Sequence, residues 1–230
     1  MSQDASYPAV WDGGQATFTA ANGTDCKVVL HRSLAGQAIG AITSTGGHRA
    51  IDVTAVSADA ASKDVVLYNG KALTVRDAAG TGTITLAAST ATRVNGDWRN
   101  EGWRIGDLVA LFAPPTQAAL AQEGKIGVVT GLTATVLTVN GTPWGAETLS
   151  TDGVMAVRLS PRGRLTPDAA SVAGTPNAGG SKGLIGSVLD PTADRTGMGL
   201  GPNELLIAQM ATAVAALPAY VSVDARELRY

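Results

Sequence analysis

Residues 97–112, DWRNEGWRIGDLVALF, place two tryptophans five residues apart, ahead of a Gly-Asp step and an apolar run. Only 4% of the 230 residues are aromatic, so two of the four tryptophans in one segment need an explanation. The rings can either close one end of a small β-barrel or form a platform that stacks on a sugar. Gly102 and the polar residues between Trp98 and Trp103 indicate a turn or bulge, which lets both rings cover one barrel end. Large aromatic side chains contribute mainly by burial, so the barrel is preferred, with Trp144 closing its opposite side.

The segments around these tryptophans predict a small β-barrel domain over residues 91–160. RIGDLVALF, GKIGVVTGL, TATVLTVNG and GVMAVRLSP each have the length and the β-branched content of a strand, and short turns separate most of them. Asp107 is interpreted as a turn residue that enters a strand. The segment APPTQAALAQEG is a longer loop between the first two strands, with room for one helical turn.

Upstream, residues 15–90 predict an antiparallel jelly-roll or Ig-like β-sandwich, preceded by an N-terminal tail over residues 1–14. Short runs rich in Val, Ile, Thr and Leu alternate with Gly- and Asn-containing turns, and no helical pattern separates them. Asn69-Gly70 lies between two apolar runs, which is the preferred sequence of a two-residue hairpin turn. The expected fold class is therefore mainly β.

Residues 161–201 read as an extended Gly/Pro-rich arm, and residues 202–230 as a C-terminal helix followed by a strand. Asn203 is the expected helix cap and Pro218 the expected end of the helix. A helix and a strand beyond a long arm cannot form a core alone, so we expect the arm and the helix to contact neighbouring subunits. The candidate inter-subunit contacts are apolar residues of these two segments: Leu184, Ile185, Val188, Leu189, Leu206, Met210 and Val214.

Composition and charge disfavour several classes of function. The formal net charge is −2 and no segment concentrates Lys or Arg, so neither nucleic acid nor an anionic membrane is an expected partner. One cysteine allows no internal disulfide. The N-terminus lacks the pattern of a signal peptide, and no run approaches the roughly 18 apolar residues of a membrane span. We expect synthesis in a reducing cytoplasm.

The chain offers few residues for catalysis. Cys26, His31 and His48 are the conventional nucleophile or base candidates besides carboxylates and hydroxyls. Cys26 and His31 are five residues apart, so they face opposite sides of a regular strand. Three such residues are too few for a typical zinc site. The prediction is a protein that is not an enzyme, with no catalytic, cofactor-binding or metal-binding residues.

The stretch DWRNEGWRIGDLVALFA…GKIGVVTGLTATVLTVNG resembles a module of tailed-bacteriophage virion proteins. That module has an aromatic residue, then G-aromatic-x-x-G-D-x-V, then a loop, then G-x-x-x-V-T-x-x-T-x-T-x-L-T-V. The segment from CKVVLHRSLAGQAIGAITSTG to DVVLYNGKALT is also similar to jelly-roll or Ig-like modules of such proteins. The resemblance covers roughly residues 20–145, and the PPTQAALAQE loop is longer than the usual link. The matching residues are Trp98, Gly102, Trp103, Gly106, Asp107, Val109, Thr130, Thr133, Thr135, Leu137, Thr138 and Val139.

The resemblance implies a structural component of a phage virion, made in the host cytoplasm. The leading expectation is a capsid decoration or cement protein that forms a homo-oligomer and contacts other virion proteins, such as the major capsid protein. A neck, collar or tail component at the head–tail junction is the second expectation, with neck or tail proteins as its partners. The third is a host-surface or carbohydrate-binding spike that uses the Trp98/Trp103 end or the APPTQAALAQEG loop.

Overall fold

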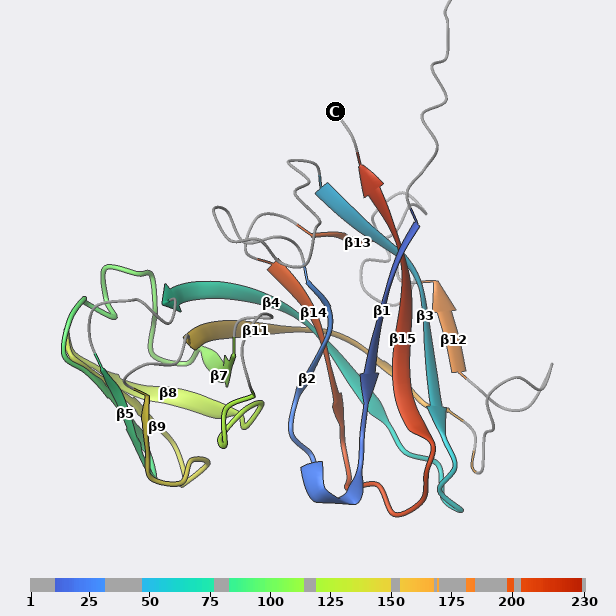
Figure 1. Ribbon diagram of the computed structural model, residues 1–230, viewed down its shortest axis with the longest axis horizontal. Coiled ribbons are helices and arrows are strands. Elements are labelled where there is room, and N and C mark those ends of the chain that lie inside the picture. The colour runs from blue at the N-terminus through green and yellow to red at the C-terminus, as the bar shows by residue number, and fades with distance from the viewer. Residues whose placement is uncertain are drawn as a thin grey trace, which may run out of the picture.

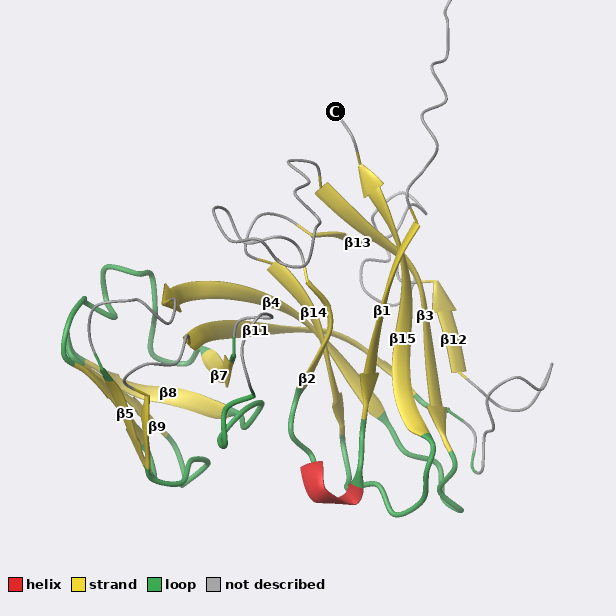
Figure 2. Ribbon diagram, in the orientation of Figure 1, coloured by secondary structure: helices red, strands yellow, loops and turns green. Residues whose placement is uncertain are grey.

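The computed structural model describes residues 11–31, 47–76, 83–113, 119–149, 154–167, 169, 181–184, 198–200 and 204–228. These residues form fifteen strands and one three-residue 3-10 helix, η1 (Ala20–Asn22), arranged in two antiparallel sheets (Figures 1 and 2). The expectation of a mainly β fold is confirmed.

The first sheet has five strands in the order β1-β15-β3-β12, and β13 also pairs with β3. Every pairing in it is antiparallel. Its strands are β1 (Trp11–Thr17), β3 (Gly47–Ser57), β12 (Ser181–Leu184), β13 (Met198–Leu200) and β15 (Ala219–Leu228).

The second sheet has ten strands in the order β10-β5-β6-β9-β8-β7-β11-β4-β14-β2. Two of them are twelve residues long and lie side by side between β7 and β14: β4 (Val65–Arg76) and β11 (Val154–Leu165). The others are β2 (Lys27–His31), β5 (Ile84–Ala87), β6 (Thr90–Arg93), β7 (Leu108–Phe112), β8 (Gly127–Leu132), β9 (Val136–Val139), β10 (Glu147–Leu149) and β14 (Glu204–Met210).

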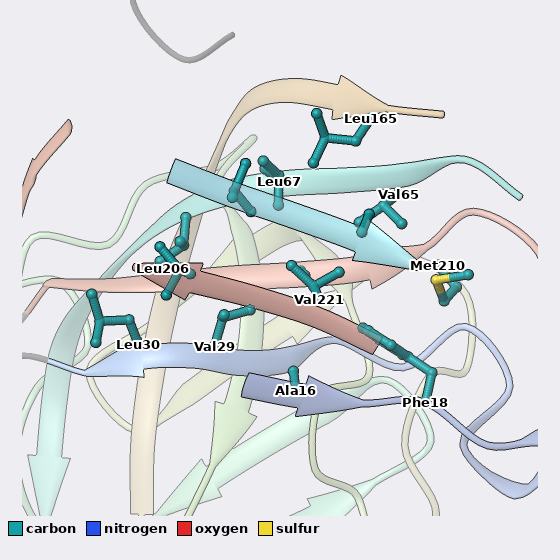
Figure 3. Close-up of a cluster of buried hydrophobic side chains, with 14 of the residues drawn as sticks. Ala16, Phe18, Val29, Leu30, Val65, Leu67, Leu165, Leu206, Met210 and Val221 are labelled. Atoms are coloured by element: carbon teal, nitrogen blue, oxygen red, sulfur yellow. The ribbon is translucent and has the colours of Figure 1, made fainter. Parts of the chain in front are cut away.

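The sheets produce two lobes that share β4 and β11 (Figure 1). In the sandwich lobe, β2, β14 and the adjoining parts of β4 and β11 face the five-stranded sheet. Their apolar side chains meet in a core that includes Phe18, Leu67, Leu206 and Val221 (Figure 3). In the curled lobe, β5 to β10 bend around a second core with the remaining parts of β4 and β11. Among the described residues the sheet of this lobe has open ends, so the small barrel expected here is a curled, open sheet.

The lobes do not follow the expected boundary at residues 90 and 91. Ile84 and Leu86 of β5 pack in the core of the curled lobe, whereas Leu206 and Val221 complete the core of the sandwich. The physical reason is that β4 and β11 each continue from one lobe into the other. The curled lobe is thus an insertion between two halves of the sandwich.

The predicted C-terminal helix is wrong, because Glu204–Met210 forms strand β14. This strand lies between β4 and β2, and both of its faces are covered. Leu206 and Met210 point into the sandwich core, while Leu205 and Ile207 join a third buried cluster on the opposite face of the sheet. A strand buried on both faces is apolar at nearly every position, so its sequence also satisfies a helical spacing. The strand predicted after it is present as β15.

The predicted hairpin turn at Asn69-Gly70 is also wrong, because β4 runs straight through it. A Cβ added to Gly70 would lie 2.5 Å from Cδ1 of Ile207 and 2.7 Å from Cγ1 of Val157. Gly70 is therefore required by the side chains of the two neighbouring strands, and not by a turn.

The expected arm over residues 161–201 is partly built into the two sheets. Its first five residues continue β11, and its later segments β12 and β13 pair with β3 of the same chain. The other residues of the arm lie largely outside the described part of the chain. Of the tail expected over residues 1–14, residues 1–10 also lie outside it, whereas residues 11–14 belong to strand β1.

Candidate functional site

Trp98 and Trp103 lie together inside the curled lobe, although five residues separate them. Their ring centroids are 6.3 Å apart and their planes meet at 76°, an edge-to-face arrangement that aromatic rings favour. Trp98 is fully buried and Trp103 is 3% exposed. Neither ring offers a face to a ligand, so this pair cannot act as a stacking platform for a sugar.

A polar network holds the two tryptophans in place. The Trp103 indole Nε1–H donates to Oγ1 of Thr74 at 3.1 Å, and the Thr74 hydroxyl donates to Oε2 of Glu101. Arg93 Nη1 lies 2.7 Å from both carboxylate oxygens of Glu101. The Arg93 guanidinium carbon is 4.7 Å from the ring centroid of Trp98, so the same cation also makes a cation–π contact. The network thus connects both rings to β4 and β6. Its arginine and glutamate were not identified from the sequence, because eight residues and no regular spacing separate them.

The Gly-Asp step after Trp103 forms the turn that begins β7. The Asp107 carboxylate accepts the backbone N–H of Arg104 at 2.8 Å. Gly106 has φ +94°, a conformation that glycine adopts without strain, and its N–H donates to the carbonyl of Val129. The structure therefore places Asp107 in the turn before β7, as expected. The backbone carbonyl of Asp107 also accepts the N–H of Val129 and so joins this turn to β8.

Trp144 packs against the same core from the segment before β10 and is 3% exposed. Its indole Nε1–H has no hydrogen-bond partner, nor does the buried Oε2 of Glu147, among the described residues. Gln122 Oε1 accepts the N–H of Gly145 at 2.8 Å, and Oε1 of Glu147 accepts the N–H of Ala121. These contacts fasten the loop of residues 119–126 to β10.

Cys26 lies where the two lobes meet and is fully buried. Its N–H donates to the carbonyl of Gly124 at 2.8 Å. Burial raises the pKa of its thiol, and Asp25 raises this pKa further, which outweighs the opposite effect of Lys27. Burial likewise raises the pKa of the Tyr68 hydroxyl to about 12, and this group donates to Gln209 at 2.8 Å. A protonated, buried thiol is a poor nucleophile.

Two carboxylates border this contact between the lobes. The pKa values of Asp25 and Glu123 are both raised, chiefly by burial. Lys27 opposes the shift at both groups, and Lys125 opposes it at Asp25. Lys27 thus attracts one carboxylate from each lobe, so ionisable groups lie on both sides of the contact between the lobes.

Asp59 is a buried carboxylate of the sandwich lobe, at 3% exposure. Its oxygens accept the N–H of Ala215 at 2.9 and 3.2 Å and the N–H of Ala216 at 2.8 Å. The acid is therefore occupied in fixing the loop between β14 and β15. No sequence motif marks it, because its partners lie about 156 residues away.

Three of the candidate inter-subunit residues are internal to this chain. Leu206 and Met210 are fully buried and Val214 is 2% exposed, all in the sandwich core. They are not available for contacts with a neighbour, because the strand that replaces the expected helix pairs within the chain. Leu184 ends β12, paired with Asp52 of β3. Ile185, Val188 and Leu189 lie outside the described residues.

His31 is at the end of β2 and His48 is in β3. Within the described residues, no group of three or more His, Cys, Asp or Glu side chains is arranged to hold a metal ion. No helix in that part of the chain is long and apolar enough to cross a membrane. Comparisons with protein-family models, curated proteins and solved structures find no match to this chain.

Proposed function

We propose that this chain is a non-enzymatic structural protein of a tailed-bacteriophage particle, a decoration protein that forms a homo-oligomer on the head shell. The proposal rests on the resemblance of residues 20–145 to virion modules. It agrees with the roles of Trp98, Trp103 and Trp144, which pack in one core. The carboxylates of Asp59, Glu101 and Asp107 likewise accept hydrogen bonds that hold strands and turns.

The observation that carries the proposal is the place of the matching residues within the curled lobe. Val109, Leu137 and Val139 fill its core together with both motif tryptophans. Gly106 and Asp107 form the turn before β7. The Thr133 hydroxyl accepts the N–H of Val136 at 2.9 Å in the turn between β8 and β9. The motif residues thus belong to one folding unit, which is the feature of this chain that supports the proposal.

The proposed position on the head shell has one alternative, the head–tail junction. A neck, collar or tail component would use the same rigid β-lobes, and its oligomer would be a ring that matches the head–tail junction. The buried tryptophans weigh against the spike that stacks sugars on Trp98 and Trp103.

The test is to measure the mass of the purified full-length chain in solution and then its binding to genome-free heads of the phage that encodes it. A decoration protein is expected to form a defined oligomer, to sediment with the heads and to raise the temperature at which they rupture. A ring that ignores the heads but binds tail-less neck complexes would move the protein to the junction. A monomer that binds neither would contradict a structural role in the particle.

A further inference from the structure

The sequence contains four Asn-Gly steps, at residues 22–23, 69–70, 95–96 and 140–141. Asparagine before glycine can modify itself, because the backbone nitrogen of the glycine can attack the side-chain amide carbon. Ammonia leaves and a five-membered succinimide ring forms. Water then opens the ring and yields aspartate or isoaspartate. Glycine permits the attack because it has no side chain to obstruct it. All four steps have this chemistry in common, so the fold decides which of them reacts.

Asn69-Gly70 is held in the middle of a sheet. It belongs to β4, which pairs with β11 on one side and with β14 on the other. Hydrogen bonds to both neighbours fix the backbone, whereas ring closure requires the nitrogen of the glycine to turn toward the asparagine side chain. Gly70 is buried beneath the side chains of Ile207 and Val157, which leaves no space for this movement.

The first and the last of the four steps each have a reacting group in a hydrogen bond. The N–H of Gly23 donates to the carbonyl of Ala20 at 3.2 Å, so the attacking nitrogen is occupied. Oδ1 of Asn140 accepts the N–H of Val128 at 2.9 Å, which fixes the side-chain amide against β8. At both steps the reaction must first break a hydrogen bond of the folded chain.

At Asn95-Gly96 both reacting groups are accessible. The step lies in the turn after β6, and both residues are exposed. Neither the side-chain amide of Asn95 nor the N–H of Gly96 has a hydrogen-bond partner among the residues that the structure describes. Gly96 has φ +94°, a conformation that glycine adopts without strain. The two groups can therefore approach each other without the loss of a hydrogen bond.

The guanidinium of Arg93 lies against this step. Its Nε–H donates to the backbone carbonyl of Asn95 at 2.5 Å, and a Cβ added to Gly96 would lie 2.5 Å from its Cζ. The nitrogen of Gly96 must lose its proton to attack, and resonance within the peptide group shares the resulting negative charge with the carbonyl oxygen of Asn95. A charge-assisted hydrogen bond at this oxygen stabilises that charge. Glu101 holds the guanidinium in place through Nη1.

We propose that Asn95-Gly96 is a site of spontaneous modification, at which the folded chain converts Asn95 to aspartate and isoaspartate with Arg93 as the activating residue. A bond forms between the nitrogen of Gly96 and Cγ of Asn95, and the bond from Cγ to the side-chain nitrogen breaks. That nitrogen leaves as ammonia with the proton from Gly96. Water then adds to one of the two ring carbonyls, and the bond from this carbonyl carbon to the ring nitrogen breaks.

The products change the network that holds the tryptophans. Each product carries a carboxylate beside Arg93, whose guanidinium already bonds Glu101 and covers the ring of Trp98. Isoaspartate also adds one carbon atom to the backbone between β6 and Trp98. The inference does not depend on the proposed function.

The test compares the four steps in one experiment on the natural full-length chain. The protein is incubated at mildly alkaline pH, folded in buffer and unfolded in guanidinium chloride, and is then cut into peptides. Mass spectrometry measures the conversion of amide to acid at each step. The unfolded chain should convert all four at similar rates. In the folded chain Asn95 should convert at least about tenfold faster than the other three, which must first break a hydrogen bond. It should also convert faster than in the unfolded chain, because only the fold brings Arg93 to it.

Two variants test the site itself. Asn95→Gln requires a slower six-membered ring, so acidic species separated by ion exchange should form at least about tenfold more slowly. Asn140→Gln is the matched control and should leave their rate unchanged. Equal conversion of Asn95 and Asn140 in the folded chain would overturn the inference.

Arg93→Lys tests the activating residue, since it keeps the positive charge but removes the Nε–H that bonds Asn95. Conversion at Asn95 in the folded variant should fall to the rate in guanidinium chloride or below it, while the rate in the unfolded variant stays unchanged. Folded Arg93→Lys that converts as fast as the natural chain would contradict activation by Arg93. A natural chain in which Asn95 converts more slowly when folded than when unfolded would contradict it as well.

Discussion

The two lobes are built from the chain in opposite ways. The core of the curled lobe comes mostly from residues 84–156, and two of its strand pairs, β5 with β6 and β8 with β9, join sequence neighbours through short turns. The sandwich core combines residues 16–67 with residues 165–223, so its strands meet only after the curled lobe has been inserted between them. The curled lobe buries three tryptophans, whereas the sandwich relies on Val, Leu, Ala and Met with a single Phe.

This difference predicts where each lobe is vulnerable. A core of a few large rings depends strongly on each ring, because a large cavity remains when one is removed. A core of many small side chains distributes its stability over more positions and more distant contacts. Contacts between distant segments also form later in folding, since long loops must close first.

Replacing Trp98 with Ala should have the largest effect. The ring is fully buried and contacts both Trp103 and Arg93, so we expect a loss of about 4 kcal/mol in the free energy of unfolding. Urea denaturation gives the size of the loss, and residue-resolved hydrogen exchange gives its location. Protection should fall in β5 to β9 before it falls in β14 and β15.

Leu206→Ala in the sandwich core is the counterpart and should reverse that order, with a loss of about 3 kcal/mol. Equal loss of protection in both lobes for both variants would mean that the shared strands β4 and β11 couple them into a single unfolding unit.

Gly124→Ala tests the contact between the lobes. Gly124 has φ +77°, and a Cβ there would collide with the backbone carbonyl oxygen of Cys26. We expect a loss of about 3 kcal/mol from strain and displaced backbone together, seen as a lower urea midpoint. Gly23→Ala is the control: its φ is +55° but nothing lies within 4 Å, so only about 1 kcal/mol should be lost. Similar losses in the two variants would show that the approach of Cys26 to Gly124 is unimportant.

Asp59→Ala addresses a long-range link within the sandwich. Removal of the carboxylate leaves the N–H groups of Ala215 and Ala216 without their acceptor, so we expect a loss of about 2 kcal/mol, measured by thermal unfolding. Asp64→Ala removes a more exposed acid that pairs with Arg164 at 2.9 Å, and it should cost less than about 1 kcal/mol. If Asp64→Ala lost more stability than Asp59→Ala, the hydrogen bonds of Asp59 would not be what fixes the loop between β14 and β15.

Glu123→Gln should have the smallest effect, visible mainly as a change in pH dependence. Burial raises the pKa of Glu123 above its ordinary value of 4.5, so the ionised form is less favourable in the folded chain than in the unfolded chain. Its contribution to stability therefore falls as the pH rises from 4.5 through the raised pKa, and stays low above it. Glutamine stays neutral, so the variant should gain stability relative to the natural chain as the pH rises from 4 to 7. Urea midpoints across this range measure the gain, and a relative loss would show that attraction to Lys27 outweighs burial.

Sequence reasoning succeeded best in the curled lobe. The strands β7, β8 and β9 all lie within segments predicted as strands, and Trp98, Trp103 and Trp144 all lie in one core. Here each strand pairs with a neighbour along the chain, so local pattern and final structure agree. The network of Arg93, Glu101 and Thr74 could not be predicted in the same way, because it depends on how β4 crosses into this lobe.

By itself, the sequence determined the β class of the chain, because short β-branched runs separated by turn residues cannot form long helices. It also determined the turn at Gly106-Asp107, where a positive φ and a carboxylate acceptor are local requirements. Only the tertiary structure decided that Glu204–Met210 is a strand and that β4 passes through Asn69-Gly70 without turning. Both outcomes depend on neighbours that are far away in the sequence. β2 and β4 pair with the two edges of β14, and the side chains of Ile207 and Val157 fill the space above Gly70. Periodicity records which residues are apolar, whereas pairing between distant strands decides how the backbone satisfies its hydrogen bonds.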